Sequence, residues 1–149
     1  MEIAKRAAKD GANIAIATKT VEPHPKLEGT IYTAQKEIEA LGGKCLAIQC
    51  DIRDEKSVKD AIKKTVDTFG GLDILINNAS AINPVGVEAM ETKSFDLIMS
   101  INTRGTFVAS KHAIPYLRKS KNPHILTISP PLYMANDVSL IHQQKVNLV

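Results

Sequence analysis

The stretch Asp73-Ile74-Leu75-Ile76-Asn77-Asn78-Ala79-Ser80 decides the fold class of this chain. Its apolar residues run into two amides and two small residues, a pattern typical of a buried strand at the point where it leaves a sheet. In open α/β sheets, ligands bind beyond the carboxyl ends of parallel strands. Taken alone, Asn-Asn-Ala-Ser is more typical of an ordinary polar turn. The flanking pattern favours the strand end.

Strands and helices alternate along the chain on both sides of this stretch. Strands are expected at residues 13–18, 44–50, 73–77 and 124–129, and helices at 1–10, 31–41, 54–69 and 92–119. This order predicts an α/β fold with a doubly wound parallel sheet and helices on both faces. Lys19, Asp51, Asn77 to Ser80 and Ser129 follow the strands, so they should gather at one edge of the sheet.

Composition excludes several classes of protein. The 149 residues are 44% hydrophobic and 23% charged, which is ordinary for a soluble globular domain. The net charge of +3 is spread along the chain with no basic block, so nucleic-acid binding is not expected. Cys45 and Cys50 lie on opposite faces of one strand, which predicts reduced thiols in an intracellular protein, with neither a disulfide nor a metal site. No stretch approaches a membrane span.

The helix expected at 92–119 is interrupted in its middle by Asn102-Thr103-Arg104-Gly105. Helix interruptions usually have an identifiable cause. A helix-breaking amide is one explanation, and a functional kink is the other.

Four features together resemble the short-chain dehydrogenase/reductase family. They are Asp51-Ile52 after one strand, Asn77-Asn78-Ala79-Ser80 after the next, Ser100-Ile101-Asn102-Thr103-Arg104-Gly105 in the long helix, and Thr127-Ile128-Ser129 at a strand end. The resemblance implies a Rossmann-like fold and hydride transfer with a nicotinamide cofactor. It covers residues 1–132 as a partial dinucleotide-binding domain, and residues 133–149 form a divergent tail.

The resemblance also implies roles for individual residues. Asp51 and Ile52 would hold the adenine, while Asn77, Asn78 and Ala79 would line the adenosine and brace the sheet. Ser80 stands where the family usually has glycine.

Two further residues would take part in catalysis. Asn102 matches the asparagine that kinks the long helix and orders a water in the proton relay. Ser129 lies near the substrate-orienting serine, although Pro130 occupies the more usual place of that side chain. Without the resemblance, Ser129 is a polar strand end.

Lys19 bears on the choice of cofactor. NAD-specific relatives carry an acid after the corresponding strand, where it binds the ribose 2′-hydroxyl. This chain has no acid there, and a cation favours a 2′-phosphate, so NADP (NADPH) is the expected cofactor. The alternative is a solvated lysine with no ligand.

The chain departs from the family pattern at both ends. It starts after the position of the family's first strand and glycine-rich turn, so we expect an incomplete sheet. The family's proton donor is a tyrosine four residues before a lysine. Tyr133 has Asp137, not lysine, four residues after it, and Lys145 has Ile141, not tyrosine, four residues before it. This chain is therefore expected to be inactive on its own.

The expected loss of the first strand bears on stability. In the family's strand order that strand is central, so two inner edges would lack partners, at about 1–3 kcal/mol for each buried unpaired group. A domain is stable by only about 5–15 kcal/mol in all. We predict that the isolated chain folds poorly unless the half-sheets close on each other or the tail fills the gap. Slow amide hydrogen exchange in all four strands would contradict this.

Three functional readings remain open from the sequence. The first is an NADP-dependent oxidoreductase acting on a lipid-like carbonyl or alcohol. The second is a non-catalytic nucleotide-binding or subunit-interaction fragment. The family resemblance implies that such a fragment would form a homo-oligomer through its long helices. The third is a truncated gene model with no function of its own. The resemblance implies a peroxisomal or mitochondrial location.

Overall fold

The computed structural model describes residues 1–22 and 30–129. Within them, the strands are β1 (Ile14–Thr18), β2 (Cys45–Gln49), β3 (Ile74–Asn77) and β4 (His124–Thr127). The α-helices are α1 (Glu2–Lys9), α2 (Ile31–Glu39), α3 (Glu55–Phe69), α4 (Thr92–Ile98) and α5 (Thr106–Leu117). A short 3₁₀ turn, η1 (Val87–Ala89), precedes α4, and a π-helix, η2 (Met99–Gly105), joins α4 to α5.

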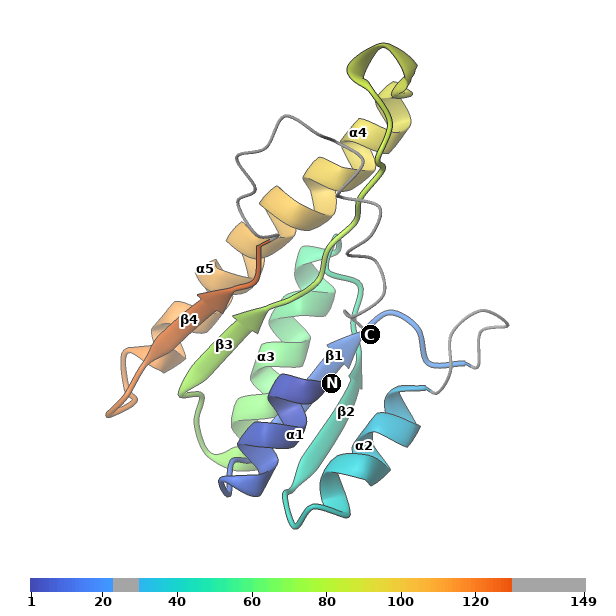
Figure 1. Ribbon diagram of the computed structural model, residues 1–149. Coiled ribbons are helices and arrows are strands. Elements are labelled where there is room, and N and C mark those ends of the chain that lie inside the picture. Colours follow the sequence, from blue (N-terminus) through green and yellow to red (C-terminus); the bar gives the residue numbers. More distant parts are fainter. Residues whose placement is uncertain (23–29, 130–149) are drawn as a thin grey trace.

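The strands form two parallel pairs. β1 lies beside β2 with Ile14 opposite Cys45, and β3 lies beside β4 with Ile74 opposite His124. Each pair is a separate two-stranded sheet, and Figure 1 shows the two sheets next to each other with similar strand directions. The predicted α/β order is therefore confirmed. The strand expected at 124–129 is shorter, because β4 ends at Thr127.

Local sequence explains where α2 and α3 begin and where α3 ends. Thr30 caps α2 by accepting from the backbone N–H groups of Tyr32 and Thr33. Asp54 caps α3 in the same way, by accepting from the N–H of Lys56 at 3.0 Å. Gly70 ends α3 with a φ of 83°, a left-handed conformation that glycine adopts without steric cost.

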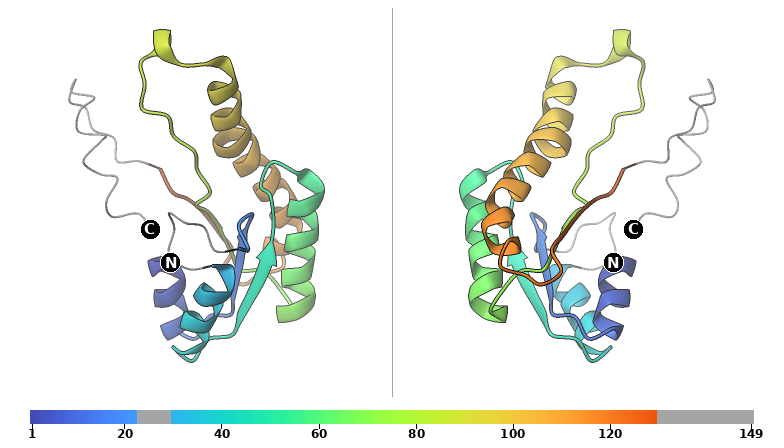
Figure 2. Two further views of the ribbon diagram at one scale, coloured as in Figure 1. Left: turned by 90° about the vertical axis from the view of Figure 1, so that its right-hand side faces the viewer. Right: turned by 90° about the vertical axis from the view of Figure 1, so that its left-hand side faces the viewer.

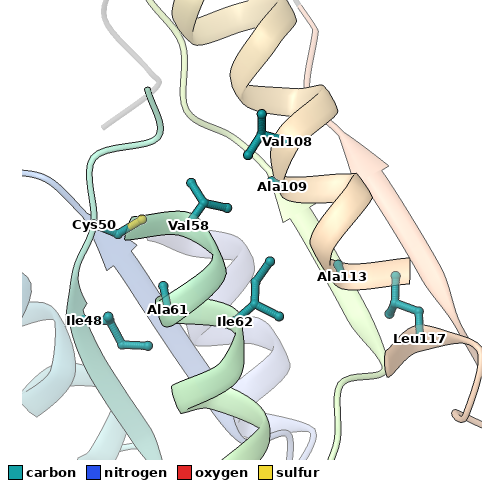
Figure 3. Packing of buried hydrophobic residues seen from close by; sticks show 9 residues of the cluster. All are labelled: Ile48, Cys50, Val58, Ala61, Ile62, Val108, Ala109, Ala113 and Leu117. Atoms are coloured by element: carbon teal, nitrogen blue, oxygen red, sulfur yellow. The ribbon is translucent and has the colours of Figure 1, made fainter. Parts of the chain in front are cut away.

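Apolar side chains are buried on both faces of the pair formed by β1 and β2. On one face, Ala8 of α1 and Ile38 of α2 pack with Cys45. On the other face, α3 and α5 pack against each other, and Figure 3 shows their apolar side chains facing one another. The side views in Figure 2 place β1 and β2 between these two layers of helices.

The two cysteines belong to different layers, as the sequence predicts. Cys45 lies in the cluster with Ile38, and Cys50 lies in the cluster of α3 and α5. Both are free thiols, and burial raises their pKa, that of Cys45 to about 11. Such thiols stay protonated and poorly nucleophilic at neutral pH.

The interruption predicted in the long helix is confirmed as a π-helix. The backbone runs from α4 through Met99–Gly105 into α5, and Asn102 lies in the π segment. Single π turns inside α-helices are frequent at functional sites. Residues that contact this π-helix are therefore candidates for the functional site.

The face of β3 opposite α5 is open to solvent in the described part of the chain. Leu75 packs against the α3 and α5 cluster, whereas Ile74 is 52% exposed. The expectation that the isolated chain folds poorly stays a prediction. Among the described helices, none has the length and apolarity needed to cross a membrane.

Candidate functional site

The turn after β2 is organised by the Asp51 carboxylate. Its Oδ1 accepts from the backbone N–H of Arg53 at 3.0 Å and from Arg53 Nε at 2.9 Å, and its Oδ2 accepts from Arg53 Nη2 at 2.6 Å. This bidentate pairing lowers the pKa of Asp51 well below its usual range. The carboxylate is therefore ionised at neutral pH, and its remaining lone pairs are available to a further donor.

Lys19 lies at the same edge, after β1. Its Nζ is 3.6 Å from Asp51 Oδ2, and its side chain is 67% exposed. The structure therefore brings together two of the predicted cofactor-binding residues. It adds Arg53, which the sequence reasoning missed although it lies two residues after Asp51. Three charged side chains, two positive and one negative, form this cluster.

Asn77 is buried at the end of β3, with 8% of its surface exposed. Its Nδ2 lies 3.4 Å from both Ser110 Oγ on α5 and Thr127 Oγ1 on β4. Its carbonyl accepts from the N–H of Ile128 at 3.0 Å. Asn77 therefore ties β3 to its neighbours from inside, while Asn78 and Ala79 follow it as exposed residues.

Asn102 holds the loop that follows β3. Its Oδ1 accepts from the N–H of Ala81 at 2.8 Å, and its Nδ2 donates to the carbonyl of Ala81 at 3.0 Å. The Asn102 carbonyl accepts from Thr106 Oγ1 at 2.7 Å. The side-chain amide thus satisfies both backbone groups of one loop residue, as a neighbouring strand would.

Ser129 is an exposed residue two positions beyond the end of β4. It belongs to the same edge as the other candidates, since it follows a parallel strand. Pro130, Tyr133, Asp137, Ile141 and Lys145 lie outside the described residues. The sequence has one Tyr-x-x-x-Lys spacing, Tyr32 to Lys36, and it lies in α2, which packs on β1 and β2 and not on the sheet that precedes Ser129.

A second charged cluster links α3 to α5. Glu55 Oε1 lies 3.0 Å from Lys111 Nζ and 2.9 Å from His112 Nε2. These hydrogen bonds lower the pKa of Glu55 to about 2. Arg104 approaches the same carboxylate at 3.9 Å. The cluster fixes the start of α3 against α5, next to the turn that carries Asp51.

Comparison with known proteins gives a consistent picture. A family model described as short chain dehydrogenase matches residues 1–133. The hydroxysteroid dehydrogenase-like protein 2 of Homo sapiens is 61% identical over 130 residues, which are 87% of this chain and 31% of the relative. The chain thus spans about a third of the length of this curated relative.

Solved structures show the same fold. A short chain dehydrogenase of Mycobacterium thermoresistibile is 54% identical with a TM-score of 0.85, and covers 90% of this chain and 48% of its own. A putative dehydrogenase from Xanthomonas campestris is 52% identical with a TM-score of 0.84, over 89% of this chain and 48% of its own. The Rossmann-like fold class expected from the sequence is confirmed by these similarities.

Proposed function

Because the chain belongs to the short-chain dehydrogenase family, we propose that it supplies the adenosine side of a cofactor site in an NADP-dependent oxidoreductase. The reaction would move a hydride between the nicotinamide and a lipid-like carbonyl or alcohol, and the cofactor supplies that hydride chemistry. The observation that carries the proposal is the cluster of Lys19, Asp51 and Arg53 beyond β1 and β2.

The charges of this cluster suit a phosphorylated ribose. Arg53 compensates the Asp51 carboxylate through two direct contacts, so the cluster keeps a net positive charge at the exposed Lys19. The position directly after β1 is Lys19, not an acid that could accept a hydrogen bond from a ribose 2′-hydroxyl. A 2′-phosphate would meet a cation there, and NADP is therefore proposed over NAD.

The remaining predicted residues take supporting roles in this proposal. Asp51 and Ile52 would hold the adenine, and Asn77, Asn78 and Ala79 would line the adenosine and brace the sheet. Asn102 would hold the loop after β3 and take part in the proton relay, and Ser129 would orient the substrate. The sequence has no Tyr-x-x-x-Lys pair after Ser129, so turnover by this chain alone is not proposed.

A second candidate function is subunit interaction without catalysis. Large apolar side chains are exposed along the α4 and α5 region, namely Phe95, Leu97, Met99 and Phe107. Such a surface favours association, here proposed as a homo-oligomer through the long helices. A peroxisomal or mitochondrial location remains a proposal that follows from the family resemblance alone.

Thermal unfolding of the chain in rising concentrations of NADPH or NADH tests the cofactor proposal. We expect NADPH to raise the melting temperature by more than NADH does. The stabilisation should approach about 2.7 kcal/mol at a hundredfold excess over Kd, because the ligand binds the native state alone. A melting temperature that responds to neither cofactor would contradict the proposal, and a larger rise with NADH would contradict the assignment of NADP.

Lys19→Ala sharpens this test. The variant should bind NADPH about tenfold more weakly, since a hydrogen bond to a charged group is worth roughly 1.5 kcal/mol. Its affinity for NADH should stay the same. Lys64→Ala is the matched control, because Lys64 is also an exposed lysine but lies on α3, outside the proposed cofactor site.

A further inference from the structure

We propose that Gly105 and Arg104 are positioning residues that hold the turn from Asp51 to Asp54 in the geometry needed for adenine binding. The inference rests on the proposed cofactor site, whose turn after β2 would be positioned by these two residues. Neither residue follows a strand, so neither is among the ligands expected from the sequence. Both belong to the π-helix between α4 and α5.

Gly105 lies directly against Ile52. A Cβ at Gly105 would stand 2.7 Å from Ile52 Cγ1 and 3.6 Å from Ile52 Cγ2. Real Cβ contacts are longer than 2.7 Å, so any side chain at position 105 must displace Ile52 or the π-helix. The missing side chain therefore lets the turn after β2 approach the helix backbone.

Arg104 fixes the next residue of the same turn. Its Nη1 donates to the carbonyl of Arg53 at 2.7 Å, and its Nη2 lies 3.9 Å from Glu55 Oε2. A charged donor makes a stronger bond to a carbonyl than a neutral one does. Arg104 and Gly105 thus hold two consecutive residues, Arg53 and Ile52, which lie beside the carboxylate of Asp51.

The same π-helix also holds the loop after β3, through the two hydrogen bonds of Asn102 to Ala81. The turn after β2 and the loop after β3 come from different sheets. One seven-residue segment, Met99–Gly105, therefore contacts both loops that are proposed to enclose the adenosine. The relative position of these loops therefore depends on the shape of this segment.

A double-mutant cycle between Gly105 and Ile52 tests the inference. The probes are NADPH and adenosine 2′,5′-bisphosphate, which carries the adenosine half alone. Gly105→Ala should weaken both probes by about tenfold, since it displaces Ile52. In the Ile52→Ala background, where both γ carbons are gone, adding Gly105→Ala should change either affinity less than about twofold.

Gly86→Ala is the matched control for glycine replacement. A Cβ there meets nothing within 4 Å, and the backbone φ of −63° suits any residue. Both affinities should stay the same in this variant. Arg104 provides an independent variant at an exposed position, with a side chain that is 50% exposed. Arg104→Ala should weaken both probes, and Arg104→Lys, which keeps a charged donor, should restore part of the affinity.

The outcomes separate this inference from the proposed function. A wild-type chain that binds neither probe overturns the proposed function and the inference with it. A wild-type chain that binds both, with Gly105→Ala and Arg104→Ala equally tight, overturns the inference alone. Equal weakening by Gly105→Ala with and without Ile52 also overturns it, because the effect would then not pass through Ile52. If Gly105→Ala does not fold, the Arg104 variants decide.

Discussion

Replacing Ile38 with alanine is expected to lower the free energy of unfolding by about 2–5 kcal/mol. Ile38 is fully buried, with 0% of its surface exposed, and it packs with Ala8 and Cys45. The substitution removes three carbons from a small cluster and leaves a cavity. Since a domain of ordinary stability has about 5–15 kcal/mol in total, this single change removes a large part of it.

Urea unfolding followed by circular dichroism measures this loss. Val87→Ala is the control, because Val87 is 93% exposed and should change stability by no more than about 0.5 kcal/mol. If Ile38→Ala lost no more than the control, the layer formed by α1 and α2 would not be part of the cooperative core. The equilibrium slope should be the same in both proteins.

Replacing Asn102 with alanine is expected to lower stability by about 1–3 kcal/mol and to release the loop after β3. The variant leaves the N–H and the carbonyl of Ala81 without their side-chain partner. Because Ala81 is half-buried, water compensates this loss only in part. Cofactor affinity should fall together with stability, since Asn78 and Ala79 belong to the same loop.

Hydrogen exchange at the Ala81 amide is the direct measurement. Asn102→Asp keeps an acceptor for the Ala81 N–H and loses the donor, so it should fall between the wild type and the alanine variant. Thr103→Ala serves as a neighbouring control, because Thr103 is exposed and its hydroxyl makes a long contact with Met99 Sδ, at 3.8 Å, and none with Ala81. An unchanged Ala81 exchange rate in Asn102→Ala would show that the two hydrogen bonds between Asn102 and Ala81 do not form in solution.

Much of the fold follows from local pattern. The apolar runs and glycine stops predict the order of strands and helices, because hydrophobic period and capping act over a few residues. The opposite placement of Cys45 and Cys50 and the break at Asn102 are both confirmed. In each case the information lies within one element.

The contacts that build the candidate site are not local in this sense. Arg104 meets Arg53 across 51 positions, and Asn77 meets Thr127 across 50. The hydrophobic period of one element does not indicate which of its side chains contact another element. The bidentate pairing of Arg53 with Asp51 could have been predicted from the sequence, because the two residues lie two positions apart in one turn. The roles of Asn102 and Ser129 in catalysis remain predictions.

The division of the strands into two pairs has a mechanical consequence. In the described part of the chain, backbone hydrogen bonds join β1 to β2 and β3 to β4, whereas α3 and α5 form one apolar cluster that contacts strands from both pairs. Hydrogen bonds are directional, whereas hydrophobic packing is not. We therefore expect a load along the strands to be resisted less between β1 and β3 than within either strand pair, so that the two pairs can shift relative to each other while the hydrogen bonds within each pair stay intact.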